Sequence, residues 1–477
     1  MKSRLVTLFL TIISIAISFS VQAQENNTGH NIEVTIKGLQ NEQLFLGFHY
    51  GQKQFIQDTI QTDEKGHGVF QGKDKLQQGI YLVITPAKKY FEILIGKDQH
   101  FSIQTNINDF VNSMKIEGSE INQAFNEYQT YMMKQTQQSR RLQKQLRSQK
   151  ENSEAAKAAQ NELEQLDQQV KEKWNSLIET YPNTILAAII KAMKTPEIPE
   201  TKIPENASNP DSLKWANRYH YYRDHYFDNI DLSDERLVRT PILRNKLKHY
   251  FDNILIQQPD SIIPHADRLI AQAKPNEETF EYITRFLINH YQQSNIMGMD
   301  KVFVHLAEKY YLSGEADWID SASLASLRER VRKIKPNLIG QIAPDLKLPK
   351  ISGEYTRLHD VESDFIILYF WEPDCGHCKK TTPKIWDLYQ QYDRNTLEVF
   401  AVYTQNDKQE WIKYINEKGF DWINAYDPYR SSNFRQKYDI YSTPTIYLLN
   451  DKKEIIAKRI NHESLKRMLE QETGKSE

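Results

Sequence analysis

The stretch FIILYFWEPDCGHCKK, residues 365–380, decides how the C-terminal part of this chain folds. Its first part, Phe365–Trp371, is an almost unbroken apolar run. Such a run is typical of a strand in a parallel sheet, because both faces of that strand are covered. Cys375 and Cys378 follow at the carboxyl end of the run, and a helical pattern extends from about residue 378 to residue 392. The stretch therefore predicts a strand, a turn with two cysteines, and a helix.

The rest of the C-terminal segment alternates between strands and helices, which predicts an α/β domain over residues 339–477. Further strands are expected at residues 397–403, 422–426, 445–449 and 454–457. Further helices are expected at residues 407–418 and 431–438, with a last helix that Asn461 caps and that ends near Gln471. Thr443 and Pro444 lead into one of these strands.

The two cysteines of the chain stand in a CxxC motif at a helix start, which points to disulfide exchange. Unpaired N–H groups and the helix dipole favour an anion at Cys375, so its pKa should fall below the free value of about 8.5. The thiolate is the attacking species, and Cys378, one turn further in, would resolve the mixed disulfide. His377 can place a positive charge or a donor near the thiolate. A zinc site would need more ligands, and there is no second CxxC pair.

These residues resemble the active-site segment of the thioredoxin superfamily. The shared features are F-W-x-x-x-C-G-H-C-K at residues 370–379, Pro383 after the second cysteine, and Thr443-Pro444 before a strand. Within that superfamily the chain is similar to exported TlpA/ResA-type oxidoreductases, which begin with a segment like GQIAPDL at residues 340–346. The separation of the CxxC motif from Pro444 leaves room for the extra strand–helix insertion of that type.

The resemblance implies a C-terminal thioredoxin fold in which Pro444 is cis and lies against the sulfurs. It implies that Cys375 and Cys378 are catalytic, and that their disulfide is the redox group, with no bound cofactor or metal. It implies protein thiols and disulfides of the Gram-negative cell envelope as partners, with a membrane electron donor as a further candidate. The residues in supporting roles would be Trp371, Gly376, His377, Thr443 and Pro444.

The chain also departs from the family pattern near the cysteines. Tyr369 stands where thioredoxins carry a buried Asp, and Thr381 stands where ResA-type proteins carry a Glu. Both acids assist proton transfer at the resolving cysteine, so the base for Cys378 is unassigned. Glu372 is the nearest acidic candidate before the motif, with a solvated side chain as the alternative. Asp374 places a negative charge beside the first cysteine, which opposes the effect of the helix.

The N-terminal segment reads as a secretory signal. Lys2 and Arg4 precede the apolar run of residues 5–19, and residues 21–23 fit the small-x-small cleavage rule. Cleavage after Ala23 predicts a periplasmic protein that does not stay inserted in a membrane, and an uncleaved membrane anchor is the alternative. No cysteine stands near the cleavage site, so a lipoprotein anchor is not expected.

Two further domains are expected between the signal and the α/β domain, which makes the protein a multidomain α+β chain. Short alternating runs with turn signals predict an antiparallel β-sandwich or small barrel over residues 24–117. Residues 118–338 read as an all-α region with a long helical hairpin, in which Ser153 caps the second helix. These two domains resemble, more loosely, the domains of unknown function that precede such thioredoxin domains in Gram-negative envelope proteins.

Three functions remain open from the sequence. The leading hypothesis is a periplasmic thiol–disulfide oxidoreductase. A thiol peroxidase-like antioxidant is the first alternative, because Ala343-Pro344-Asp345 also occurs in peroxiredoxins, although Glu372 stands where those carry a Thr. The second is a scaffold or binding protein with an accessory redox domain. The formal net charge of -2 gives no electrostatic case for a nucleic-acid partner.

Overall fold

The computed structural model describes residues 29–149, 153–200, 203–204 and 206–474. The predicted signal peptide, residues 1–23, lies outside the described residues. The chain divides into two compact units. The first ends at Lys173, and the second runs from Trp174 onward and also includes the turn His49–Gln54. The domain boundaries expected after residues 117 and 338 stay a prediction.

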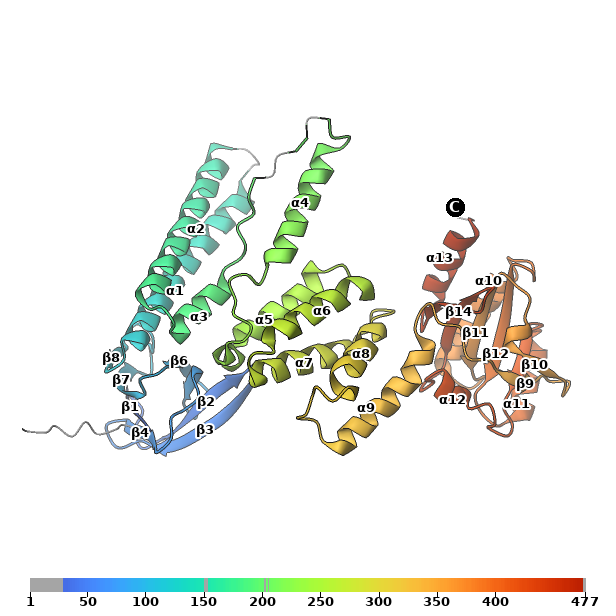
Figure 1. The fold of residues 1–477 in the computed structure, drawn as a ribbon, viewed down its shortest axis with the longest axis horizontal. Helices are drawn as coiled ribbons and strands as arrows, with labels where there is room; N and C mark the ends of the chain where they lie inside the picture. The colour runs from blue at the N-terminus through green and yellow to red at the C-terminus, as the bar shows by residue number, and fades with distance from the viewer. Residues whose placement is uncertain (1–28, 150–152, 201–202, 205, 475–477) are drawn as a thin grey trace, which may run out of the picture. The chain divides into compact units, whose positions relative to one another are not determined.

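Two four-stranded sheets make up the strand-rich part of the first unit (Figure 1). One has the order β4-β1-β7-β8, with β1 at His30–Lys37, β4 at His67–Gly72, β7 at His100–Asn106 and β8 at Lys115–Glu117. The other has the order β3-β2-β5-β6, with β2 at Gln43–Tyr50, β3 at Lys53–Gln61, β5 at Gly79–Ile84 and β6 at Tyr90–Ile95. Val34 and Ile103 from the first sheet share one apolar cluster with Leu46 and Val83 from the second.

The predicted antiparallel arrangement is wrong for one pair of strands. β1 and β7 run parallel, with Val34 opposite Ile103, whereas β1 and β4 are antiparallel. Alternating apolar and polar residues identify a half-buried strand, but this period of two is the same in both kinds of pair. The sequence pattern therefore could not reveal the direction of the partner strand.

Two long helices follow the strands. They are α1 at Glu120–Ser148 and α2 at Glu154–Thr180. Leu142 of α1 packs with Ala159 and Leu166 of α2 in a buried cluster, which joins the two helices. The Ser153 hydroxyl accepts a hydrogen bond from the N–H of Ala156 at 3.2 Å, so the predicted N-cap is confirmed.

The second unit begins with a helical region. Its helices are α3 at Ile185–Met193, α4 at Pro210–His225, α5 at Pro241–His249, α6 at Pro259–Ala273, α7 at Glu277–Gln292, α8 at Asp300–Leu306 and α9 at Ser321–Ile334. Leu247, Leu269, Leu287 and Val302, one from each of the helices α5 to α8, are fully buried in a single apolar cluster. Among the described residues, no helix has both the length and the hydropathy that crossing a bilayer requires.

The second unit ends with a thioredoxin-like α/β domain around a five-stranded sheet of order β13-β12-β11-β14-β15. The strands are β11 at Phe365–Trp371, β12 at Leu397–Tyr403, β13 at Ile423–Tyr426, β14 at Thr445–Asn450 and β15 at Ile455–Lys458. β11, β12 and β13 are parallel, and β14 and β15 are antiparallel to their neighbours. Two short strands, β9 at Lys347–Pro349 and β10 at Tyr355–Arg357, form a separate pair.

Apolar layers cover both faces of this sheet, as the run in β11 predicts. Ile367 and Tyr369 belong to one buried cluster, and Ile366 and Leu368 belong to another, because alternate residues of a strand point to opposite faces. The first cluster includes side chains of α10 at Gly376–Tyr389, α11 at Lys408–Lys418 and α13 at His462–Thr473. The second includes a side chain of the short helix α12 at Phe434–Lys437. The Asn461 side chain accepts from the N–H of Ser464, which confirms the predicted cap of α13.

Within the second unit, polar contacts join the helical region to the α/β domain. Arg330 of α9 donates to Asp439 Oδ1 at 2.7 Å and to the Tyr441 hydroxyl at 2.9 Å. The Asp439 side chain is only 3% exposed, so water screens this ion pair weakly. Residues 439–441 directly precede Thr443 and Pro444. The helical region therefore contacts the chain that leads into that turn.

Candidate active site

The two cysteines lie where β11 ends and α10 begins. Cys375 is the N-cap of α10, and its Sγ accepts a hydrogen bond from the backbone N–H of Cys378 at 3.4 Å. The helix starts at Gly376 and ends at Tyr389, so its predicted bounds of 378 and 392 are wrong at both ends. The apolar period that predicts the helix begins only after the cap, because Gly376 and His377 carry no core-facing side chain.

The turn before β14 lies against the first cysteine. Cys375 Sγ is 3.3 Å from the Thr443 carbonyl oxygen, with the thiol as donor. The peptide bond between Thr443 and Pro444 is cis, as the resemblance implies. Phe370 of β11 is opposite Thr445 of β14 in an antiparallel pair, so the start of β14 lies beside the end of β11. The sheet thus brings together predicted site residues that are far apart in sequence.

Hydrogen bonds favour the thiolate of Cys375. Partial burial is the largest influence on this thiol and disfavours the charged form, but the donors around Sγ outweigh it and lower the pKa of Cys375 below its ordinary value. The backbone N–H of Cys378 donates to the sulfur, and the thiol of Cys378, the Thr443 side chain and the backbone N–H of His377 also lower this pKa. Cys375 can therefore carry the nucleophilic thiolate near neutral pH.

The environment of Cys378 favours the neutral thiol over the thiolate. Its side chain is 1% exposed. Burial raises the pKa of Cys378 to about 12, although the backbone N–H of Glu372 and the Thr443 side chain act in the other direction. The two thiols of one helical turn therefore differ strongly in acidity, and Cys378 needs a proton acceptor before it can attack a disulfide.

Tyr369 does not replace the acid whose position it occupies. Its hydroxyl is hydrogen-bonded to Thr382 Oγ1 at 2.8 Å, and both side chains are fully buried. Burial raises the pKa of Tyr369 well above its ordinary value, so the phenol stays neutral. A neutral phenol with so high a pKa cannot take the proton from Cys378.

The Glu372 side chain makes a hydrogen bond within the protein, whereas the sequence had left a solvated side chain as the alternative. Its Oε1 accepts a hydrogen bond from the Thr443 hydroxyl. The Thr443 side chain also lowers the pKa of Cys378, so this hydroxyl acts on the thiol while it is bonded to a carboxylate. The sequence signal was an acid three residues before the first cysteine, and only the fold shows that it meets the residue before the cis-proline.

The other predicted supporting residues occupy different environments. Trp371 is fully buried, and its ring stacks on Tyr369 with centroids 6.2 Å apart. Gly376 lies at an open surface, where an added Cβ would meet no heavy atom within 4 Å. His377 is exposed, and its contact with the sulfur of Cys375 comes from its backbone N–H. Asp374 is also exposed, so water screens its charge.

A metal centre finds no support in the part of the chain that the structure describes. There, no group of three or more His, Cys, Asp or Glu side chains is placed to hold an ion. His220 and His225 on α4 have the spacing of a zinc-ligand pair. Two imidazoles without further ligands do not complete a tetrahedral site.

Two family models match different stretches of the chain, one over the α/β domain and one that begins within α2. Residues 339–458 match the AhpC/TSA family. Residues 156–337 match a family described only as a domain of unknown function, DUF5106. The C-terminal match covers the strand β11, both cysteines and the cis-proline.

Curated relatives of the α/β domain are named thiol–disulfide oxidoreductases. The ResA protein of Oceanobacillus iheyensis is 29% identical over 121 residues, which are 24% of this chain and 62% of that protein. The ResA protein of Geobacillus kaustophilus is 27% identical over 135 residues, 28% of this chain and 76% of that protein. The two matches thus cover about a quarter of this chain, and in the first case less than two thirds of the relative.

Two solved structures are also similar to parts of this chain. A domain of a possible thiol-disulfide isomerase from Cytophaga hutchinsonii is 37% identical and covers 29% of this chain and 95% of that chain, with a TM-score of 0.27. A thioredoxin-like protein from Bacteroides caccae is 23% identical and covers 58% of this chain and 98% of that chain, with a TM-score of 0.44.

The first prediction concerns the acidity of the two thiols. We expect iodoacetamide to modify Cys375 of the reduced chain at least tenfold faster than Cys378 at pH 7, because only Cys375 has a lowered pKa and an accessible sulfur. The Cys375 rate should level off as pH rises through its lowered pKa, whereas Cys378 should react only at strongly alkaline pH. Mass mapping after brief labelling measures both rates. Equal labelling at pH 7 would contradict this assignment of roles.

The second prediction separates the His377 backbone from its imidazole. His377→Pro removes an N–H that donates to the sulfur at a helix position where Pro is tolerated, so the reduced form loses stabilisation. A lost charge-assisted bond of about 1.5–3 kcal/mol corresponds to a reduction potential lower by roughly 30–60 mV. His377→Ala keeps the N–H and should change the potential by less than about 10 mV.

Redox titration against a dithiothreitol or glutathione buffer gives both potentials. If His377→Ala lowers the potential as much as His377→Pro does, the imidazole is the stabilising group. If neither variant changes it, residue 377 has no part in setting the potential.

Proposed function

We propose that the protein is an exported thiol–disulfide oxidoreductase that exchanges disulfides with protein partners in the cell envelope through Cys375 and Cys378. The observation that carries this proposal is the unequal pair of thiols at one helix start: an accessible sulfur with a lowered pKa beside a buried one whose pKa is about 12. The names of the relatives of this domain agree with it. The predicted signal at residues 1–23 supports export to the periplasm.

The order of the steps in disulfide exchange follows from the different environments of Cys375 and Cys378. The thiolate of Cys375 attacks one sulfur of a partner disulfide, the bond between the partner sulfurs breaks, and a mixed disulfide and a partner thiolate form. Cys378 then loses its proton and attacks the sulfur of Cys375. The Cys375–Cys378 disulfide forms, and the partner leaves as a dithiol that has gained two electrons. The same steps in reverse oxidise a partner dithiol.

The deprotonation of Cys378 is the step for which this chain needs its own acceptor. We infer that the proton passes through the Thr443 hydroxyl to the carboxylate of Glu372, because this hydroxyl donates to Glu372 and the Thr443 side chain lowers the pKa of Cys378. The neutral phenol of Tyr369 and the exposed Asp374 offer no such route. Glu372 thus takes over the task of the acids that the family has at residues 369 and 381.

The third prediction tests which sulfur meets the partner. Cys378→Ser should accumulate mixed disulfides with envelope proteins through Cys375, because the resolving thiol is gone. Cys375→Ser should accumulate few, and the variant without either thiol serves as the control. Non-reducing gels followed by mass spectrometry identify the bond. Capture by Cys375→Ser alone would reverse the roles, and rapid peroxide consumption without any mixed disulfide would favour the peroxidase alternative.

The fourth prediction tests the proton route. At pH 7, Glu372→Gln should slow closure of the Cys375–Cys378 disulfide from a preformed mixed disulfide by roughly 10- to 100-fold, because a general base is lost. The defect should shrink as pH rises, since hydroxide can then remove the proton from a thiol whose pKa is about 12. Thr443→Val should slow closure similarly, and in Glu372→Gln the alkylation of Cys375 should change far less.

Stopped-flow release of a labelled thiol from the mixed disulfide measures closure. Asp374→Asn is the matched control, because Asp374 is an exposed acid beside the motif. A closure rate for Glu372→Gln that equals that of the unaltered chain at every pH would exclude the carboxylate as the proton acceptor.

A further inference from the structure

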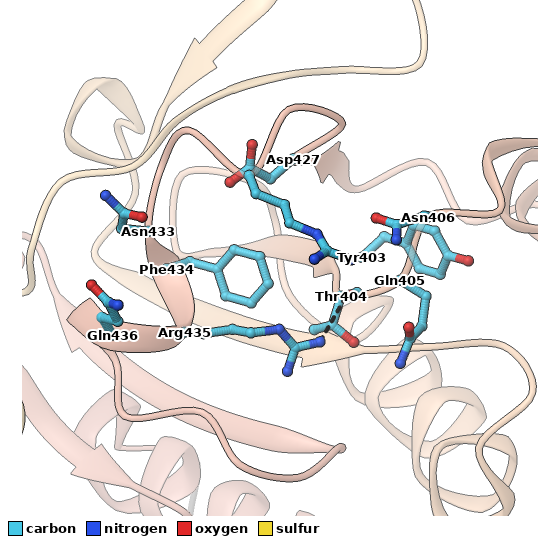
Figure 2. A pocket seen from close by; sticks show the side chains of 10 residues that line it. Tyr403, Thr404, Gln405, Asn406, Asp427, Asn433, Phe434, Arg435 and Gln436 are labelled. Carbon is cyan, nitrogen blue, oxygen red and sulfur yellow. Dashed lines mark hydrogen bonds between the residues drawn. The ribbon is translucent and has the colours of Figure 1, made fainter.

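A pocket of about 440 Å³ lies at the carboxyl edge of the five-stranded sheet, where β12 and β13 end (Figure 2). Its volume lies in the range of sites for small ligands or a few side chains. The pocket has a buried floor of Tyr403, Thr404, Asp427 and Phe434. Its exposed rim consists of amide and guanidinium side chains, from Gln405, Asn406, Arg430, Asn433, Arg435 and Gln436.

One polar atom of the floor has no partner. Thr404 is 7% exposed, and its Oγ1 is buried without a hydrogen bond from any described residue. Its side chain lines the pocket, and Figure 2 shows Arg435 reaching toward it. Arg435 Nη2 donates to the Thr404 carbonyl at 2.8 Å. Buried hydroxyls are normally satisfied, so an unpartnered one that lines a pocket points to a polar ligand.

Asp427, the acidic residue of the floor, already accepts hydrogen bonds from its own loop. The carboxylate of Asp427 accepts from the N–H of Ser431 at 2.9 Å, and from the N–H and hydroxyl of Ser432 at 3.0 and 2.6 Å. These bonds stabilise the loop after β13, and they engage the carboxylate of Asp427 within that loop. The two arginines of the rim, Arg430 and Arg435, are then left as the charges that face a ligand.

The pocket and the cysteines share one edge of the sheet. β11 and β12 are parallel neighbours with Trp371 opposite Tyr403, and such strands lie about 4.8 Å apart. The N–H of Thr404 donates to the Trp371 carbonyl at 3.1 Å, four residues before Cys375. Burial is the main reason that the pKa of Tyr403 is raised to about 12, and the charge of Asp374 contributes to this shift. The floor of the pocket is therefore within electrostatic reach of the CxxC loop.

We propose that this pocket is a subsite that binds a carboxylate carried by the disulfide substrate, close to the sulfur that Cys375 attacks. Guanidinium groups pair with carboxylates through charge-assisted hydrogen bonds, and the amides and the Thr404 hydroxyl supply further donors. The carboxylate can belong to an acidic side chain that flanks the substrate cysteine, or to a low-mass disulfide. The inference rests on the proposed function, since it names the substrate class of the same site.

The test compares two disulfide-linked peptides that differ only by Glu or Gln, with that residue placed in turn two to five positions from the cysteine. With the full chain, we expect the Glu peptide to have a kcat/KM about five- to tenfold higher at the best position, as two partly exposed ion pairs would give. The preference should reside in KM, because the carboxylate takes no part in the exchange of sulfur bonds.

Variants of the rim and the floor should remove this preference. The double variant Arg430→Gln, Arg435→Gln should bring the two peptides within about twofold, with little change for the Gln peptide. Thr404→Val should weaken the preference without lowering the unfolding temperature, because its hydroxyl has no partner to lose. Arg467→Gln on α13, an exposed arginine of the same domain, is the matched control and should change nothing.

A binding experiment distinguishes failure of the subsite from failure of the proposed function. Calorimetry can measure the affinity for Glu and Gln peptides whose cysteine is replaced by serine, and this binding needs no redox step. Preference for the Glu peptide without turnover of either disulfide would keep the subsite and overturn the oxidoreductase function. Equal kcat/KM and equal binding for Glu and Gln peptides, or a preference that survives the double variant, would overturn the subsite. Oxidised glutathione as a third substrate shows whether a low-mass carboxylate suffices or a polypeptide is required.

Discussion

The contact between Cys375 and the cis Thr443–Pro444 turn is the constraint on which the site depends. It exists because β14 is the antiparallel neighbour of β11, so that the chain entering β14 arrives where β11 ends. Any other strand order would separate these residues. The two apolar layers that cover the sheet hold this arrangement, with β11 buried on both faces. The chemistry of the thiols thus rests on the packing of a strand.

One turn of helix produces two different thiols from the same residue type. Cys375 stands outside the helix as its cap, where N–H groups converge on the sulfur. Cys378 lies inside the first turn against the core, where burial opposes any charge. Because the sulfur of Cys375 is accessible, it can attack a partner or be attacked by one. Burial protects the sulfur of Cys378 until the mixed disulfide has formed. The Thr443 side chain lowers the pKa of both thiols, and its hydroxyl donates to Glu372.

The carboxyl edge of the sheet also explains where a substrate could be recognised. Parallel strands end at the same edge, so the loops after β12 and β13 stand beside the CxxC loop. Those loops belong to the segment that separates the CxxC motif from the cis-proline, which is where the sequence predicts an insertion. On the side of the helical region, Arg330 holds the chain just before the cis-proline through Asp439. The loops after β12 and β13 and the helical region therefore both reach the edge of the sheet where the sulfurs lie.

The sequence by itself determined what depends on near neighbours: the apolar strand β11, the CxxC motif at a helix start, and the caps Ser153 and Asn461. These features arise from periodicity and from side chains that bond N–H groups a few residues away. Only the tertiary structure decided that β1 and β7 are parallel, that Glu372 meets Thr443 across 71 residues, and that Thr404 is buried without a partner. Each of these depends on which strand or loop lies alongside, and residue spacing carries no information about a partner so distant in the chain.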